Sequence, residues 1–375
     1  MQIAKMYHEP TFKPTHAETV MVQMMLAIMK FQVATRNRDS GTAIGLHEQS
    51  NAHYHYALTL LHELVASHTL QDIQAMTVIC IHLRGFPNPG AAWMLSSWTL
   101  DLAIEMGLHR SANVSPDNSK PDVFELETRK RVFWSLLTLV ITIGGKFGRP
   151  MPLRVEDFDV ELPEPFSDNL PSEEGVSGVP KCSYLCGVEM FKLTEISLET
   201  YACIYAIRRR QNYEETVRSL ERKAEAWKKQ LPPMLTEGSD ASKEPENRGF
   251  AVWMEYWEAE YQLLLHHPAL CNSTSRAFIQ RNLDICSKAA SKLIRTVAQL
   301  HELIVLDITW NGTIIHIAAM FTLLFVYWER RDQITPSDLH KLKAELIICL
   351  DIIGYVSQLL GAKSHIHTFS WTILC

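Results

Sequence analysis

The chain has 375 residues, of which 47% are hydrophobic and 21% are charged. This balance is typical of a soluble globular protein and excludes a largely disordered chain. The formal net charge of -6 argues against direct binding of nucleic acid by this segment, because contacts with phosphates need clustered Lys and Arg side chains.

The cysteines and the amino terminus indicate an intracellular, reducing compartment. The eight cysteines are scattered, without a pair of C-x2-C elements at the spacing of zinc ligands. Cys182 and Cys186 form a lone C-x3-C, which we interpret as reduced, mostly buried thiols. The apolar stretch "VMVQMMLAIMKF" lacks the basic region and cleavage pattern of a secretory signal. We expect no metal site and no cofactor.

Helical periodicity dominates the chain, and strand alternation is nearly absent, so we expect an all-α, bundle-like domain over residues 1–375. Helices are predicted near 15–35, 51–67, 70–84, 91–107, 184–208, 214–230, 250–266, 275–299, 303–329 and 335–361. Four segments rich in Pro, Gly, Ser and charge are expected to be loops: 36–45, 111–122, 163–181 and 231–249. The last two are the best candidates for disorder.

Two of these helices can be described in detail from their spacing. The helix over 91–107 is expected to end at Gly107 and to bury Ala91, Leu95, Trp98, Leu102 and Met106. The helix over 335–361 is expected to begin with Thr335 as its cap and Pro336 in its first turn. Its buried stripe is predicted as Leu339, Leu342, Leu346, Cys349, Ile353, Val356 and Leu360.

The segment 310–328 is long and apolar enough to be considered as a membrane span. It contains Asn311 and His316, and a similar apolar run occurs at 132–143. A large helical protein needs central helices that are hydrophobic all round, so we predict a buried helix and no membrane contact.

The segment 126–165 changes character twice, from a buried helix to a stop and then to an acidic extension. The helix is expected to end at Arg149-Pro150, because proline disfavours helical geometry in the residue before it. In "RVEDFDVELPEP", apolar Phe158, Val160 and Leu162 alternate with acids, which predicts an extended segment with one packed side.

Three stretches, "AAWMLSSWTLDLAIEMGLHR", "ELETRKRVFWSLL" and "GRPMPLRVEDFDVELPEP", resemble the fungal-specific transcription factor domain, the middle homology region of the fungal binuclear zinc cluster regulators. The most specific similarity covers 91–163. Weaker similarities are "HEPTF" at 8–12, "LQDIQAMTVIC" at 70–80 and "YQLLLHHPALC" at 261–271.

The resemblance implies an all-α regulatory domain of a nuclear transcription regulator that senses a small molecule or binds a protein of the transcription machinery. A second copy of the chain is a further partner to consider. In the family a DNA-binding zinc cluster usually precedes this domain, and these 375 residues do not contain that cluster.

The sequence departs from the family at Val140 and Ile141, where an ion pair is usual, and at His267-Pro268, where Arg-Pro is usual. It also starts abruptly at Met1. These departures keep an alternative open, namely a stand-alone, cytoplasmic descendant that binds small molecules or acts as a cyclase-like enzyme in secondary metabolism. Whether the protein is an enzyme is left undecided, with a regulatory role favoured.

No sequence motif for nucleotide binding or hydrolysis occurs, so no catalytic residue is proposed. His53, His55, His62 and Glu63 do not converge on a metal site when placed on a helix. A ligand cavity would be lined by aromatic side chains with a few polar groups. The candidates are Trp253, Trp257, Tyr261, Trp310 and His316.

The residues that carry the family resemblance are interpreted as structural: His109, Arg110, Trp134, Arg149 and Asp157. Arg149 is expected to pair with Asp157 or with another acid.

Overall fold

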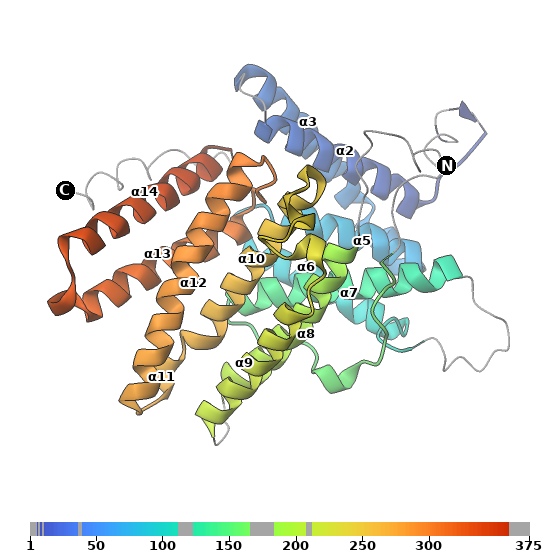
Figure 1. The fold of residues 1–375 in the computed structure, drawn as a ribbon. Coiled ribbons are helices and arrows are strands. Elements are labelled where there is room, and N and C mark those ends of the chain that lie inside the picture. The colour runs from blue at the N-terminus through green and yellow to red at the C-terminus, as the bar shows by residue number, and fades with distance from the viewer. Residues whose placement is uncertain are drawn as a thin grey trace. The chain divides into compact units, whose positions relative to one another are not determined.

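A computed structural model describes residues 6, 8, 9, 11–36, 40–111, 123–165, 184–207 and 212–359. These residues form α-helices and short 3-10 helices and include no strand, so the predicted all-α class is confirmed (Figure 1). Contacts divide the chain into two compact units. Unit 1 comprises Met1–Pro152 and Glu156–Pro163, and unit 2 comprises Leu153–Val155 and Glu164–Cys375. That residues 1–375 act as one domain stays a prediction.

Unit 1 is built from six α-helices within the described ranges. They are α2 (His16–Arg36), α3 (Ser40–Thr59), α4 (Leu61–Ser67), α5 (Leu70–Leu83), α6 (Pro89–Glu105) and α7 (Val123–Lys146). Helix α2 packs on α3 and α5, and α7 packs on α5 and α6. The short helix η2 (Val155–Asp157) follows α7.

Helix α6 ends as its sequence predicts but buries a different face. Gly107 has a φ of 70° and so stops the helix in the left-handed region. The buried residues are Ala92, Ser96, Thr99, Leu100, Leu102 and Ala103. Of the predicted face, Leu102 is buried, whereas 43% of Trp98 is exposed. Periodicity favours the larger apolar side chains, whereas the face that is buried carries the small residues Ala92, Ser96 and Ala103.

Helix α7 is the buried helix that the apolar run predicts, with most residues from Val132 to Gly144 buried. Its end is set by Gly148, whose φ is 62°, before Arg149-Pro150 is reached. Residues 155–157 of the segment that we predicted to be extended form the short helix η2 instead. From Phe158 onward, Val160 is buried between the exposed residues Asp159 and Glu161, so the predicted alternation is confirmed over 158–162.

Unit 2 contains seven α-helices within the described ranges. They are α8 (Leu185–Ile204), α9 (Tyr213–Lys229), α10 (Pro245–His266), α11 (Ala269–Asn272), α12 (Arg276–Glu302), α13 (Trp310–Glu329) and α14 (Pro336–Leu359). Helix α10 packs on α8 and on α12, and α12 packs on α13 and α14, as Figure 1 shows. Three short 3-10 helices join these elements: η3 (Pro233–Leu235), η4 (Ala241–Lys243) and η5 (Arg331–Gln333).

Two apolar cores result in unit 2. The first core lies among α10, α12, α13 and α14 and includes Leu263, Leu293, Leu323 and Ile353. The second core lies among α8, α9, α10 and the start of α12 and includes Leu193, Leu220, Tyr261 and Phe278. Helix α10 contributes to both cores.

Several predicted boundaries need correction. The loop expected at 36–45 is helical from Ser40, and the helix expected from 303 begins only at Trp310. Ile304 interrupts the helix because its φ of 59° is left-handed. The segment 231–249 is ordered by η3, η4 and the first turn of α10, and Leu235 in it is 1% exposed. The predicted loops at 112–122 and 166–181 lie outside the described residues.

Helix α14 begins with the predicted cap, since the Asp338 amide donates to Thr335 Oγ1 over 3.2 Å. Its buried stripe is largely the predicted one, but 54% of Leu339 is exposed. Leu360 lies outside the described residues.

Helix α13 is not buried all round, contrary to the prediction. A third of its most apolar window is buried, and Phe321, Phe325 and Trp328 are exposed. By length and composition alone, α2 and α13 could each cross a membrane. The absence of membrane contact stays a prediction.

Candidate functional site

The family motif residues of unit 1 lie where the extended segment meets α7. Trp134 is 2% exposed, and its Nε1 donates a hydrogen bond to the Glu161 carbonyl oxygen over 3.1 Å. Its ring packs edge-on against Phe158, with centroids 5.5 Å apart. Trp134 thus attaches the extended segment to the helix through both packing and a hydrogen bond.

The turn after α6 holds the same segment by its backbone and side chains. The Asp159 amide donates to the His109 carbonyl oxygen over 3.1 Å, and Arg110 Nε lies 3.1 Å from Asp159 Oδ1. Ser111 Oγ donates to Glu161 over 2.6 Å. That hydrogen bond is the main reason why the pKa of Glu161 is lowered.

The ion pair expected at Arg149 is formed by a different residue. Among the described residues the guanidinium of Arg149 lies 5.0 Å from the centre of the Trp93 ring and forms no ion pair with Asp157. In the acidic extension, Asp159 pairs with Arg110. The sequence could not show this, because the choice depends on how the turn after α6 approaches the segment.

In unit 2, four rings from α10 and α13 form an aromatic layer, defined as Trp253, Tyr256, Trp257 and His316. The centroid distances are 5.6 Å from Trp253 to Trp257, 5.2 Å from Trp253 to Tyr256, and 6.1 Å from Tyr256 to His316. The last two contacts are edge-on, an arrangement that aromatic pairs prefer. Spacings of three and four residues place the α10 members on one side of that helix.

The aromatic layer contains three of the five predicted ligand-binding residues. Tyr261 lies in the second core, where its hydroxyl is 3.0 Å from Thr200 Oγ1. Trp310 is half-buried at the start of α13 and makes no ring contact among the described residues. Tyr256 was missed, although its place three residues after Trp253 is a helical spacing that could have indicated it.

A small void adjoins the aromatic layer at His316. It is too narrow for a water molecule, and it is lined by Leu293, Ile294, Val297, His316, Cys349 and Ile352. His316 is 3% exposed, and its carbonyl oxygen lies 3.4 Å from Cys349 Sγ. Burial raises the pKa of the Cys349 thiol to about 12, so this thiol stays protonated. The void is therefore a dry, apolar space among α12, α13 and α14.

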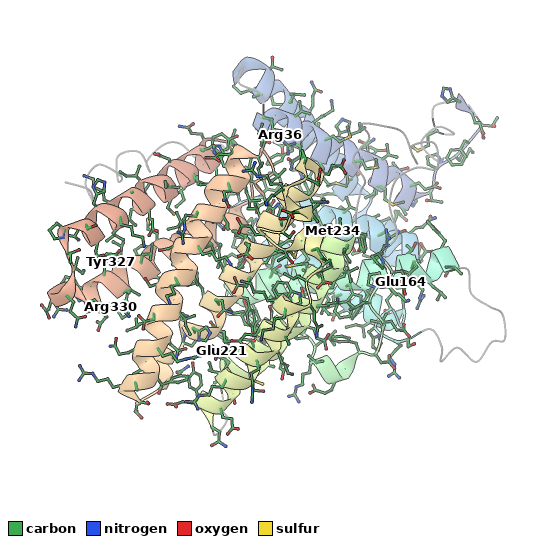
Figure 2. The ribbon with its side chains drawn as sticks, viewed as in Figure 1. Arg36, Glu164, Glu221, Met234, Tyr327 and Arg330 are labelled. Carbon is green, nitrogen blue, oxygen red and sulfur yellow. The ribbon has the colours of Figure 1, made fainter. Side chains whose placement is uncertain are left out.

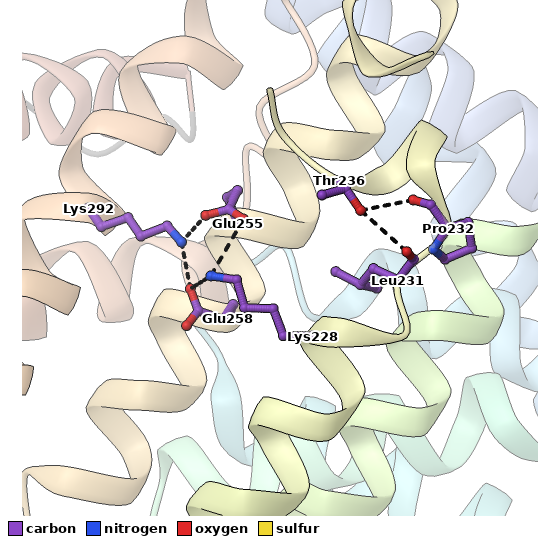
Figure 3. Close-up of polar contacts among 7 residues, drawn as sticks. All are labelled: Lys228, Leu231, Pro232, Thr236, Glu255, Glu258 and Lys292. Carbon is purple, nitrogen blue, oxygen red and sulfur yellow. Dashed lines mark hydrogen bonds and ion pairs between the residues drawn. The ribbon is translucent and has the colours of Figure 1, made fainter. Parts of the chain in front are cut away.

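The opposite side of α10 carries a charge cluster, shown in Figure 3. Glu258 accepts from Lys292 over 2.6 Å and lies 3.2 Å from Lys228 Nζ, and Glu255 contacts both lysines. Burial, and next the Lys228 ammonium, lower the pKa of Lys292 to about 7, while the charge of Glu237 acts in the opposite direction. The cluster joins α9, α10 and α12, which fixes the helix that carries the aromatic layer.

A wider surface hollow of about 1100 Å³ lies in unit 1 at the amino ends of α2, α5 and α7. Its polar groups largely serve as helix caps. Asp72 Oδ2, for example, accepts from the amide and the hydroxyl of Thr69. Satisfied caps offer few free groups for recognising a ligand, so this hollow is the weaker candidate.

The described residues include no group of three or more His, Cys, Asp or Glu side chains that could hold a metal ion. His53 Nδ1 lies 2.6 Å from Gln23 Oε1, which gives one of the histidines singled out in the sequence a packing role between α2 and α3. Cys186 is a buried free thiol, and Cys182 lies outside the described residues.

Comparison with known proteins places these features in context. The model of the fungal specific transcription factor domain matches residues 2–229. "Activator of stress genes 1" of Saccharomyces cerevisiae is 28% identical over 257 residues, which is 66% of this chain and 26% of that protein. An "ABC-transporter-regulating transcription factor" of Aspergillus oryzae is 29% identical over 185 residues, covering 47% of this chain and 20% of that protein.

A transcriptional regulatory protein of Schizosaccharomyces pombe is 25% identical over 236 residues, covering 61% of this chain and 29% of that protein. The chain thus spans less than a third of each of these three relatives. No solved structure matches the chain.

Proposed function

The chain belongs to the family of fungal-specific transcription factor domains, and we propose that it regulates transcription by binding a small apolar effector beside the aromatic layer. The predicted class, a regulatory domain of a fungal transcription regulator, is confirmed by the family match and by relatives that regulate transcription. The effector, a contact with the transcription machinery and a nuclear location are parts of the proposal.

The single observation that supports the effector site is the void beside His316. The space there leaves no room for water, and its lining is aliphatic apart from His316, so it would accept an apolar ring only after the surrounding helices separate. The aromatic layer on one side and aliphatic side chains on the others match an apolar, planar ligand.

The narrowness of the void suggests how binding would become a signal. A ring cannot enter unless α13 or α14 moves away from α12, since the space does not admit even water. An effector would therefore favour an arrangement of helices that differs from the one described, and its differential affinity would shift the population between the two. Well-packed helices respond by discrete shifts because interiors are dense.

The test is a thermal-shift screen of residues 1–375 against small apolar and aromatic compounds. We expect a ligand present at about 100 times its dissociation constant to stabilise the fold by about 2.7 kcal/mol, which raises the melting temperature measurably. Val297→Leu, which fills part of the void, should abolish the shift. Val305→Leu is the matched control, since Val305 is 40% exposed.

A ligand-induced rise in melting temperature that persists in Val297→Leu would show that the effector binds outside the void. A screen in which no compound changes the melting temperature would contradict the sensing role. No observation on the described residues favours the alternative of a stand-alone cyclase-like enzyme.

A further inference from the structure

The outer face of α13 carries a row of apolar side chains that unit 2 leaves uncovered. Ala318, Phe321, Phe325 and Trp328 follow one another at spacings of three, four and three residues, which is one side of a helix. The exposed fractions are 61% for Phe321, 43% for Phe325 and 66% for Trp328. Three large aromatic side chains thus stand in solvent on a single helix face.

The inner face of the same helix is apolar as well. His316, Ala319, Leu323 and Val326 are buried there, and α13 packs on α12 and α14. Figure 2 labels Tyr327 and Arg330 near the end of α13, where Arg330 donates to Asp284 of α12 over 2.6 Å. Surface helices normally have one apolar stripe, and a helix that is apolar on both sides normally has both sides covered.

The exposed area is larger than scattered surface residues would give. At 150–250 Å² for a whole aromatic side chain, the three rings expose on the order of 400 Å². A stable interface buries about 800 Å² on each partner. The row therefore supplies about half of the area that a dimer needs on each partner.

We propose that this face pairs with the same face of a second copy, with the two α13 helices antiparallel. A two-fold axis beside Leu323 would set Phe321 against Phe325 of the second copy and Trp328 against its Ala318. The largest side chain of the row would then lie over the smallest, which leaves room for the indole. A two-fold contact has to be self-complementary in this way.

The charges at the ends of the row fit the same arrangement. Glu329 and Asp332 are exposed just beyond the carboxyl end of the row. In an antiparallel pair they approach the amino-terminal turns of the other α13, where the helix dipole favours carboxylates. The Arg331 guanidinium lies 5.2 Å from the Trp328 ring and would border the buried aromatics on the solvent side.

The first experiment is sedimentation equilibrium of residues 1–375 from about 1 to about 100 μM, the range in which a modest interface dimerises. We expect a dimer that Phe321→Ser with Phe325→Ser weakens by at least about tenfold. Ile44→Ser is the matched control, because Ile44 is a 59% exposed apolar residue on α3. Circular dichroism melting verifies that each variant folds. A wild-type chain that is monomeric throughout this range overturns the proposal.

The second variant, Ala318→Trp, tests the register. It adds apolar area but places two tryptophans against each other in the proposed pairing, so we expect it to disrupt the dimer. Stronger self-association of Ala318→Trp would mean non-specific adhesion and would overturn the proposal.

Flotation with phosphatidylcholine and phosphatidylserine vesicles tests whether this face binds a lipid surface. Co-flotation that Ala318→Trp strengthens would assign this face to a lipid surface instead. The dimer does not depend on the effector, so either proposal can fail alone.

Discussion

His82 of α5 lies in an aromatic box within unit 1. Its ring centroid is 5.8 Å from that of Phe31, 5.3 Å from that of Tyr54 and 5.1 Å from that of Phe86. The residue is 7% exposed, and its Nε2 is buried without a hydrogen-bond partner among the described residues. Burial lowers the pKa of His82 to about 4, so the side chain is neutral near pH 7.

This environment predicts a loss of stability in mild acid. The unfolded chain binds a proton at His82 below pH 6.5, whereas the folded chain does so only near pH 4, so acid favours unfolding between these values. The contribution is about 2 kcal/mol between pH 7 and pH 5. His82→Phe keeps an aromatic ring and removes the titration. Urea unfolding at both pH values should show that the variant is less sensitive to acid by this amount, and an equal sensitivity would contradict the assigned burial.

At the scale of elements, two kinds of contact attach the extended segment to its unit, and they contribute differently to the free energy of unfolding. The Arg110 and Asp159 side chains are 56% and 50% exposed, so their ion pair contributes at most about 1 kcal/mol. The Trp134 indole is buried and donates to a backbone carbonyl. Removing a buried donor costs about 1–3 kcal/mol, because its acceptor loses its partner.

We therefore expect Trp134→Phe to destabilise the protein by about 2 kcal/mol and Asp159→Asn by less than 1 kcal/mol. Chemical denaturation of both variants measures the difference. High salt serves as the control, since it should weaken the contribution of Asp159 and leave that of Trp134 unchanged. A larger effect of Asp159→Asn would show that the ion pair, and not the indole, attaches the segment.

At the scale of the whole molecule, the net charge bears on nucleic acid. The formal charge is -6, and several basic side chains already pair within the chain, as Lys228 and Lys292 do with Glu258. We expect residues 1–375 not to retard a labelled DNA duplex in about 50 mM salt, because few cations are left for phosphates. Retardation that falls steeply with added salt would contradict this expectation.

The family match and the proposed sites lie in different parts of the chain. The family model covers residues 2–229, which includes all of unit 1 and the helices α8 and α9 of unit 2. The aromatic layer, the void and the exposed face of α13 all lie after residue 229. The properties proposed for this chain therefore rest on its own residues more than on the family similarity.

Much of the fold could be predicted from the sequence, because short-range interactions determine it. The all-α class, the end of α6 at Gly107, the cap of α14 at Thr335 and the alternation at 158–162 each follow from residues close together in the chain. Backbone conformation, capping and helical spacing act over a few residues, so a sequence alone displays them.

Only the tertiary structure decided which faces meet. It buried small residues on α6, exposed the outer face of α13, and brought Trp253, Trp257 and His316 together while leaving Tyr261 in another core. It also paired Asp159 with Arg110. These outcomes depend on neighbours far away in the chain, and an apolar periodicity shows that a face exists without showing what will cover it.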